Sequence, residues 1–198
     1  RDQLRAVLRP SEGFRKMGAI ISMDALAAVL PSLLTYEPDT GKLFWLERPG
    51  APKQWNARFA RREAFTAKNC SGYHHGTLMG RTISAHRAIW CLQTGEWPSD
   101  QVDHVNLDRS DNRWSNLRSA TRSENNRNTR SRPNASSRFI GVQFHRLSGK
   151  WAARIRLGGK QKYLGTFADE IAAANAYDAA VLKSGDQFMR RNFIGGEA

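Results

Sequence analysis

Apolar and polar positions alternate only over short stretches in the first third of the chain, which predicts small elements. Asp24–Leu34 predicts a short helix that either stops at Pro31 or begins a new turn there. Two β-prone runs, Leu34–Tyr36 and Lys42–Leu46, flank the turn residues PDTG and predict a hairpin. Residues 47–71 are polar and irregular, and we expect no regular element in them.

The pattern becomes more regular after residue 71. GYHHGTLMGRTIS alternates around two glycines and predicts a second hairpin. Ser84 is placed to cap a helix over Ala85–Thr94, which ends at Gly95. We then expect a strand, a polar loop, a second strand and a helix capped by Thr121 or Ser123, in the order Gln101–Val105, Asn106–Ser115, Leu117–Ala120 and a helix starting near Glu124.

A change of composition marks the best domain boundary in the chain. Residues 128–137 hold almost nothing apolar, so we place a linker at residues 131–136. Beyond it, FIGVQFH, KWAARIRL and KYLGTF predict three short strands. The helix predicted over Asp169–Lys183 has one apolar face, formed by Ile171, Ala174, Tyr177 and Val181.

The net charge indicates what kind of partner the protein binds. The 198 residues include 31 Lys and Arg against 18 Asp and Glu, a net charge of +13. Such an excess favours a polyanion, and nucleic acid in particular, over a basic face that only keeps the protein in solution. Cys70 and Cys91 have no CxxC spacing, which argues against a zinc ribbon or a disulfide framework. No apolar run approaches the roughly 20 residues of a membrane span.

The segment VDHVNLDRSDNRWSNLRSATRSENNRN carries the most chemistry. Asp103 and His104 are adjacent on a predicted strand, Asn116 follows twelve residues after His104, and Asn125 nine residues later. Strand, loop, strand and helix can bring these groups around one pocket. Hydrolysis of a phosphodiester needs an activated water and a positive charge, which a neutral histidine and a hard cation supply. The alternative is that the pair ends a strand while the asparagines form turns and caps.

This segment resembles the ββα-metal motif of HNH nucleases, in the phage homing-endonuclease variant with Asn in place of the last His. The resemblance implies that His104 is the general base and that Asn116 orients its imidazole. It also implies that Asp103 and Asn125 hold one divalent cation. Two oxygen ligands suit Mg²⁺ or Mn²⁺ rather than zinc.

Residues around the motif have weaker assignments. His86 in SAHRAIW resembles the AHR element upstream of the motif, and we interpret it as a structural histidine that packs against Trp90, with a catalytic role as the alternative. Four arginines are expected to contact backbone phosphates: Arg118, Arg122, Arg127 and Arg130.

The C-terminal segment resembles AP2 domains over nearly its full length. The matching residues are the GV, KW, LGTF and AAxAYDxAA stretches and the closing Asn192 and Phe193. The resemblance implies a three-stranded sheet laid in the DNA major groove. The side chains expected to reach DNA are Gln143, His145, Arg154, Arg156, Lys162 and Tyr163. A solvated basic face is the alternative.

Together these features predict an α+β chain with a ββα-metal nuclease core and an AP2-like three-stranded antiparallel sheet packed on one helix. We expect an irregular and hairpin region at 1–71, in which 1–22 is a fragment edge or upstream translation. The nuclease core is expected at 72–130 and the AP2-like domain at 137–193.

The predicted function is metal-dependent cleavage of double-stranded DNA, targeted by the C-terminal domain. The alternative is a regulatory DNA-binding protein whose nuclease motif is inert. We expect no membrane partner, no small-molecule substrate and no further cofactor. We also expect a monomer that acts on DNA in the cytoplasm of a bacterial or phage-infected cell. Homing, phage packaging and defence remain open as biological roles.

Overall fold

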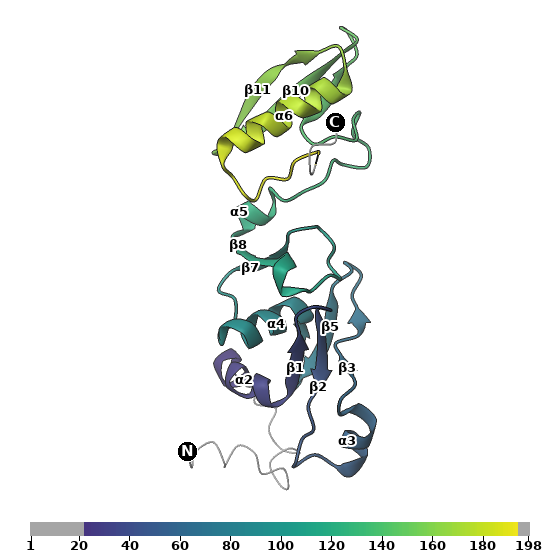
Figure 1. Ribbon diagram of the computed structural model, residues 1–198, viewed down its shortest axis with the longest axis vertical. Helices are drawn as coiled ribbons and strands as arrows, with labels where there is room; N and C mark the ends of the chain where they lie inside the picture. The colour runs from purple at the N-terminus through teal and green to yellow at the C-terminus, as the bar shows by residue number, and fades with distance from the viewer. Residues whose placement is uncertain (1–21, 194–198) are drawn as a thin grey trace. The chain divides into compact units, whose positions relative to one another are not determined.

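The computed structural model describes residues 22–193, and the chain is a mixed α/β protein with small antiparallel sheets (Figure 1). It divides into two compact units, Arg1–Ser119 and Ala120–Ala198. The sequence had placed the division at the linker, residues 131–136. The difference arises because the polar residues after 120 belong to the second unit, where Arg127 Nε lies 2.9 Å from Asp186 Oδ2. The expectation for residues 1–21 lies outside the described residues.

The first unit is built from short helices and three small sheets, ordered β1-β2-β3, β4-β5-β6 and β7-β8. Its elements are α2 (Met23–Val29), η1 (Leu30–Ser32), β1 (Leu34–Glu37), β2 (Lys42–Trp45), α3 (Lys53–Phe59), β3 (Glu63–Ala64), β4 (Ala67–Lys68), β5 (His74–Leu78), β6 (Arg81–Ser84), α4 (Ala85–Thr94), β7 (Gln101–His104), η2 (Trp114–Asn116) and β8 (Leu117–Ala120). Both predicted hairpins form, as β1–β2 and β5–β6. Pro31 is the second residue of the 3-10 turn η1 (Leu30–Ser32), where its missing N–H costs no hydrogen bond.

The expectation that residues 47–71 are irregular was wrong. This segment contains α3, β3 and β4, and β3 extends the first hairpin while β4 pairs with β5. The side chain of Asn56 exchanges two hydrogen bonds with the backbone of Arg48, which holds α3 against the preceding loop. Strands of two residues carry no readable periodicity, because their pairing depends on neighbours supplied by the tertiary fold.

The core of the first unit gathers apolar side chains from α2, the hairpins and α4. Leu26, Leu30, Ala88 and Ile89 are 0% exposed. Ser84 occupies the N-cap position of α4, but its side chain makes no capping hydrogen bond there. Gly95 ends the helix in the left-handed conformation, as the sequence predicts. The helix contacts β5, β6 and β7. This packing fixes the position of β7, which carries the Asp-His pair.

The second unit begins with α5 (Arg122–Asn125), followed by β9 (Val142–His145), β10 (Lys150–Leu157), β11 (Lys160–Phe167) and α6 (Glu170–Ser184). The three strands form an antiparallel sheet in the order β11-β10-β9, and α6 lies across β10 and β11 (Figure 1). Three residues of the predicted helix face are buried: Ala174, Tyr177 and Val181. The fourth, Ile171, is 38% exposed, so its assignment to that face was wrong.

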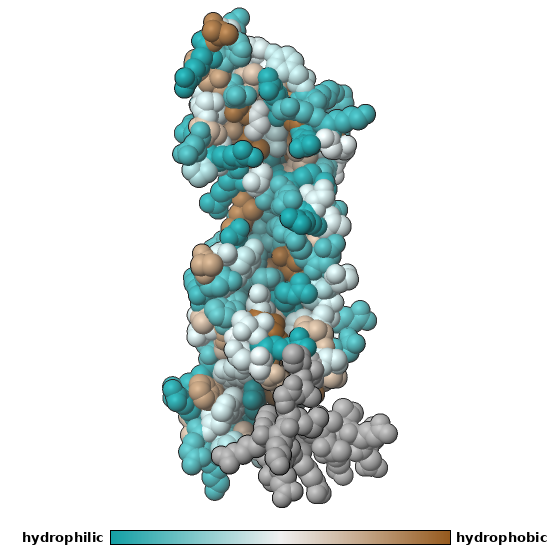
Figure 2. All heavy atoms as spheres, turned by 180° about the vertical axis from the view of Figure 1, so that it is seen from behind, coloured by the Kyte–Doolittle hydropathy of each residue, from teal (hydrophilic) through white to brown (hydrophobic). Residues whose placement is uncertain are grey.

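The surface carries hydrophobic residues as separate spots on a mainly hydrophilic face (Figure 2). The exposed large apolar side chains come from different elements and include Met79, Val105, Leu147 and Leu182. Scattered residues of this kind are normal for a folded protein in water. Within residues 22–193, no helix has the length and apolar character that crossing a bilayer requires.

Candidate functional site

Strand β7 carries the adjacent residues Asp103 and His104, and both lie in the interior of the first unit. Their side chains point to opposite sides of the strand, as neighbours on a β-strand do. Both are nevertheless buried, with exposed fractions of 4% and 3%. A buried carboxylate and a buried imidazole each need partners, and these partners define the site.

The imidazole of His104 is held by Asn112, a residue of the loop after β7. His104 Nε2 lies 3.1 Å from Asn112 Oδ1. An amide oxygen only accepts hydrogen bonds, so Nε2 carries the proton and donates it. In the neutral ring, Nδ1 is then the basic nitrogen. Asn112 therefore fixes both the tautomer and the orientation of His104.

Asn116 acts on the same loop rather than through a described bond to the imidazole. Its Nδ2 donates to Asp111 O at 2.7 Å, and its Oδ1 accepts from Asn106 N at 2.9 Å. The side chain thereby closes the loop that carries Asn112. The sequence assigned Asn116 to orient His104, and the structure gives the direct contact to Asn112, which the sequence reading did not single out.

The first hairpin supports the same loop from another side. Tyr36 Oη on β1 donates to Asn112 O at 2.9 Å. Gly41, at the hairpin turn, has φ +73, and a Cβ there would lie 2.6 Å from Arg113 N. The turn therefore packs backbone against backbone at the loop. The only sequence signal for this contact was the glycine of PDTG, which the hairpin alone already explained.

Two further rings pack around His104. His86 on α4 lies 5.2 Å from it between ring centroids in an edge-on arrangement, and Tyr73 lies 5.7 Å away. Tyr73 also contacts His86 at 5.0 Å. Burial, followed by the nearby His104, lowers the pKa of His86 to about 3. His86 is therefore neutral, and its described ring contacts are with Tyr73 and His104, whereas the sequence predicted packing against Trp90.

The same burial keeps His104 neutral. Desolvation lowers the pKa of His104, and the hydrogen bond that its imidazole donates to Asn112 and the charge of Asp103 oppose that shift. A histidine with a lowered pKa is unprotonated at neutral pH. The described geometry therefore gives a fixed, neutral imidazole, which is the state required of a general base.

Asp103 is paired with Arg118 of β8. Arg118 Nε lies 2.9 Å and Nη2 2.8 Å from the same oxygen, Asp103 Oδ2. Arg118 was expected to contact DNA phosphate, and the structure instead places its guanidinium beside the buried carboxylate. The ion pair compensates the burial of the negative charge.

Asn125 is the last residue of α5 and belongs to the second unit. Thr121 and Glu124 form a capping box at the start of this helix, which confirms one of the two predicted caps. The donor set expected for a cation is one carboxylate and one amide oxygen. Within residues 22–193 no cluster of three or more His, Cys, Asp and Glu side chains is suited to a metal. Oxygen atoms of this kind are the ligands that a hard cation prefers, and the cation site stays a prediction.

The remaining arginines near the motif lie in the second unit. Arg122 is exposed in the first turn of α5. Arg127 forms the ion pair with Asp186 already described. Arg130 lines a groove together with other arginines. Of the four arginines expected to contact phosphate, Arg122 and Arg130 are exposed, whereas Arg118 and Arg127 form ion pairs within the protein.

The sheet of the second unit presents five of the six expected DNA contacts on one side. Cross-strand register places Tyr163 opposite Arg154, so their side chains share a face, and alternation adds the other members. These exposed residues are Gln143, His145, Arg154, Arg156 and Tyr163. Lys162 is exposed as well, but it pairs with the buried Ile155 and so lies on the other side of β11.

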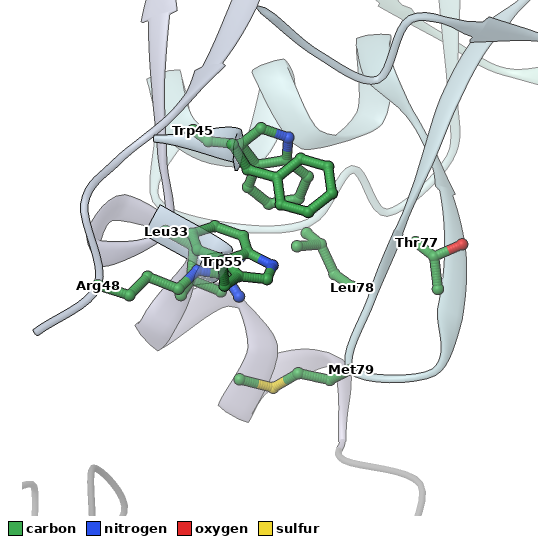
Figure 3. Close-up of a pocket in the computed structure, with 8 residues that line it drawn as sticks. Leu33, Trp45, Arg48, Trp55, Thr77, Leu78 and Met79 are labelled. Atoms are coloured by element: carbon green, nitrogen blue, oxygen red, sulfur yellow. The ribbon is translucent and has the colours of Figure 1, made fainter. Parts of the chain in front are cut away.

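A separate cavity of about 310 Å³ lies in the first unit (Figure 3). Arg48 stacks on Trp55, with its guanidinium carbon 4.1 Å from the ring centroid, and also lies near Trp45. The described residues lining this cavity include no His, Cys, Asp or Glu. These lining residues offer no carboxylate, imidazole or thiol for acid-base chemistry, so the candidate site is the one around His104.

Comparison with known proteins agrees with this assignment. Residues 84–127 match the family model described as HNH endonuclease. This match contains His86, Asp103, His104, Asn112, Asn116 and Asn125.

A further part of the chain is similar to plant proteins of the AP2 group. The AP2-like ethylene-responsive transcription factor TOE2 of Arabidopsis thaliana is 44% identical over 62 residues, which cover 31% of this chain and 13% of that protein. APETALA2-like protein 2 of Oryza sativa subsp. indica is 50% identical over 48 residues, covering 24% and 11%. An AP2/ERF and B3 domain-containing protein of Oryza sativa subsp. japonica is 43% identical over 63 residues, covering 32% and 17%.

The chain spans less than a fifth of the length of these relatives. No solved structure matches it. The chain thus combines an HNH endonuclease domain at residues 84–127 with a stretch similar to AP2-type transcription factors.

Proposed function

We propose that this protein is a metal-dependent DNA endonuclease and that its second unit binds the DNA substrate. The observation that carries the proposal is the buried, neutral His104, fixed by Asn112 inside the segment that matches HNH endonucleases.

In this proposal His104 Nδ1 accepts a proton from the attacking water while Nε2 stays bonded to Asn112. The water oxygen forms a bond to phosphorus, and the bond from phosphorus to the leaving sugar oxygen breaks. Because burial keeps the imidazole neutral, it can take up this proton at neutral pH. Asn112 and the rings of His86 and Tyr73 hold the imidazole so that little reorganisation is needed.

Asp103 and Asn125 would hold one Mg²⁺ or Mn²⁺ through oxygen atoms. When bound, such a cation stabilises negative charge that develops on the phosphate. Asp103 already bonds Arg118 through Oδ2. Phosphate is an alternative partner for the Arg118 guanidinium, so DNA binding would leave more of the carboxylate for the cation.

The first test is cleavage of supercoiled plasmid by the full chain with Mg²⁺, with EDTA as the control. We expect nicked or linear products only with the metal. His104→Ala should reduce the rate by about 10² to 10⁴-fold, the usual contribution of a general base, while DNA affinity stays nearly unchanged. Cleavage by His104→Ala at the wild-type rate would contradict the assignment.

The second test concerns the cation ligands and does not depend on cleavage. Binding of Mn²⁺ to the DNA complex can be followed by electron paramagnetic resonance, with Asn125→Ala compared with Asn125→Asp. We expect weaker binding in the alanine variant and retained binding in the aspartate variant, since both Asn and Asp offer an oxygen. Equal Mn²⁺ affinity in the wild type and both variants would remove Asn125 from the ligand set.

The alternative function is a regulatory DNA-binding protein with an inert nuclease motif. The similarity to transcription factors is the observation that favours it. DNA binding without metal-dependent cleavage of any plasmid or genomic substrate would select this alternative.

A further inference from the structure

The second unit contains a groove that is distinct from its sheet face. Its volume is about 680 Å³, and its walls are formed by residues 130–140 and 190–192. Five arginines line it: Arg130, Arg132, Arg138, Arg190 and Arg191. The described residues along the groove include no Asp or Glu.

Asn192 fastens the two walls to each other. Its Oδ1 accepts from Ile140 N at 2.7 Å, and its Nδ2 donates to Ile140 O at 3.2 Å. Asn192 N in turn donates to the buried Asp178 on α6 at 2.7 Å. Phe139 and Phe193 also pack together, with ring centroids 5.3 Å apart. Two segments about fifty residues apart in sequence therefore form one fixed surface.

The wall formed by residues 130–140 is itself tied down, although the sequence predicts a linker there. Ser137 is buried, donates to Glu170 Oε1 at 2.7 Å and accepts from Phe139 N at 3.0 Å. Ser131 Oγ donates to Ser137 O at 2.7 Å. The bond from Ser137 ties this wall to Glu170 of α6. The groove is thus preformed. Binding a partner there does not have to order this segment, because folding has already done so.

The chemistry of the groove points to a row of phosphates. Guanidinium groups that line one hollow repel each other, and an anion bound between them reduces this repulsion. A guanidinium donates paired hydrogen bonds to phosphate oxygens in a planar fork. A single free phosphate could reach only some of the five, whereas a nucleic-acid backbone supplies one anion after another.

We propose that this arginine groove binds the sugar-phosphate backbone of duplex DNA as a second contact surface of the unit, beside the sheet face. The proposal rests on the proposed function only in taking DNA as the partner. The sheet side chains would supply base contacts, and the groove would supply affinity without reading sequence.

The test measures DNA affinity of the full chain at several salt concentrations by fluorescence anisotropy. EDTA is present throughout, so that cleavage does not interfere. The variant is Arg132→Gln/Arg191→Gln, and the slope of log K against log salt is expected to flatten by about 2 units, at roughly 0.9 per phosphate contact. The matched control, Lys53→Gln/Arg62→Gln, removes two exposed charges from the first unit and should change the slope less.

A second variant, Arg132→Lys/Arg191→Lys, keeps the charge and should retain most of the slope. It also serves as a check should the glutamine variant fold poorly, which thermal melting would reveal. A slope unchanged in the glutamine variant, or changed equally in the control, overturns the proposal. The proposal is also overturned if the glutamine variant loses salt slope with duplex RNA but not with duplex DNA.

The outcomes separate this inference from the proposed function. A wild-type chain that binds no DNA would overturn both. A chain that binds DNA, keeps its slope in the glutamine variant and still cuts plasmid would overturn the groove alone. A chain that fails to cut plasmid but loses slope in the variant would overturn the nuclease and retain the groove.

Discussion

The two units place their polar side chains in opposite environments. In the first unit, Asp103, His104, Asn112 and Asn116 are 3–6% exposed and bonded within the protein. In the second, the polar side chains of the sheet face and of much of the arginine groove are exposed to solvent. Burial fixes geometry and shifts pKa values, whereas exposure leaves charge available for a partner. The comparison teaches that proton transfer at His104 should depend on the first unit and DNA affinity on the second.

The strongest way to sharpen this comparison is to replace Asn112 with Leu. The change keeps similar volume but removes the acceptor that holds His104 Nε2. We expect the rate of plasmid cleavage to fall about 10²-fold, within the range for general-base catalysis, while DNA affinity barely changes. Asn112→Asp keeps an acceptor and should lose less activity. A large loss of affinity in the leucine variant would break the separation of roles.

Gly41 tests whether the distant hairpin supports the site. In Gly41→Ala, the left-handed backbone and the Cβ, 2.6 Å from Arg113 N, should together lower the free energy of unfolding by about 2–3 kcal/mol. Cleavage should also slow, because Asn112 is displaced. Gly72 provides a control, since its φ is +86 and nothing lies within 4 Å of a Cβ there. Gly72→Ala should lose about 1 kcal/mol and keep its cleavage rate per folded molecule. Urea unfolding and initial rates check both variants.

The sheet face gives the reverse test. Arg154→Gln/Arg156→Gln removes two exposed charges that lie on the outward side of β10. We expect DNA affinity at moderate salt to fall about tenfold and the salt slope to flatten by about 2 units. The rate of cleavage at saturating protein should remain near that of the wild type. A fall in this saturated rate with unchanged affinity would reverse the assignment of roles.

His86 should give the smallest effect, on acid stability. Its folded pKa of about 3 lies below the ordinary value of 6.5, so the unfolded state binds the proton more strongly. Stability from this group is therefore complete above pH 6.5 and declines as the pH falls toward 3. Between pH 7.5 and 5.5 the loss should be about 1 kcal/mol. His86→Phe should show a smaller decline in urea midpoint over the same range, and an equal decline in both proteins would disprove the assignment.

The sequence by itself determined most of the local elements and placed Asp103 and His104 on one strand. Ser84 and Gly95 bound α4, the PDTG turn joins β1 and β2, and β7 carries Asp103 and His104 as predicted. These features are readable because caps, turns and strand alternation depend on residues close in sequence. The three strands and the helix of the second unit were readable for the same reason.

The tertiary structure alone decided which side chains meet. The contact between Asn112 and His104, its support by Tyr36 and Gly41, and the ion pair of Asp103 with Arg118 join residues from different elements. Likewise, only the fold turned the predicted linker into a wall of the arginine groove. Periodicity records which face of an element is buried, but it does not record the partner on the other side. That partner depends on how the elements pack.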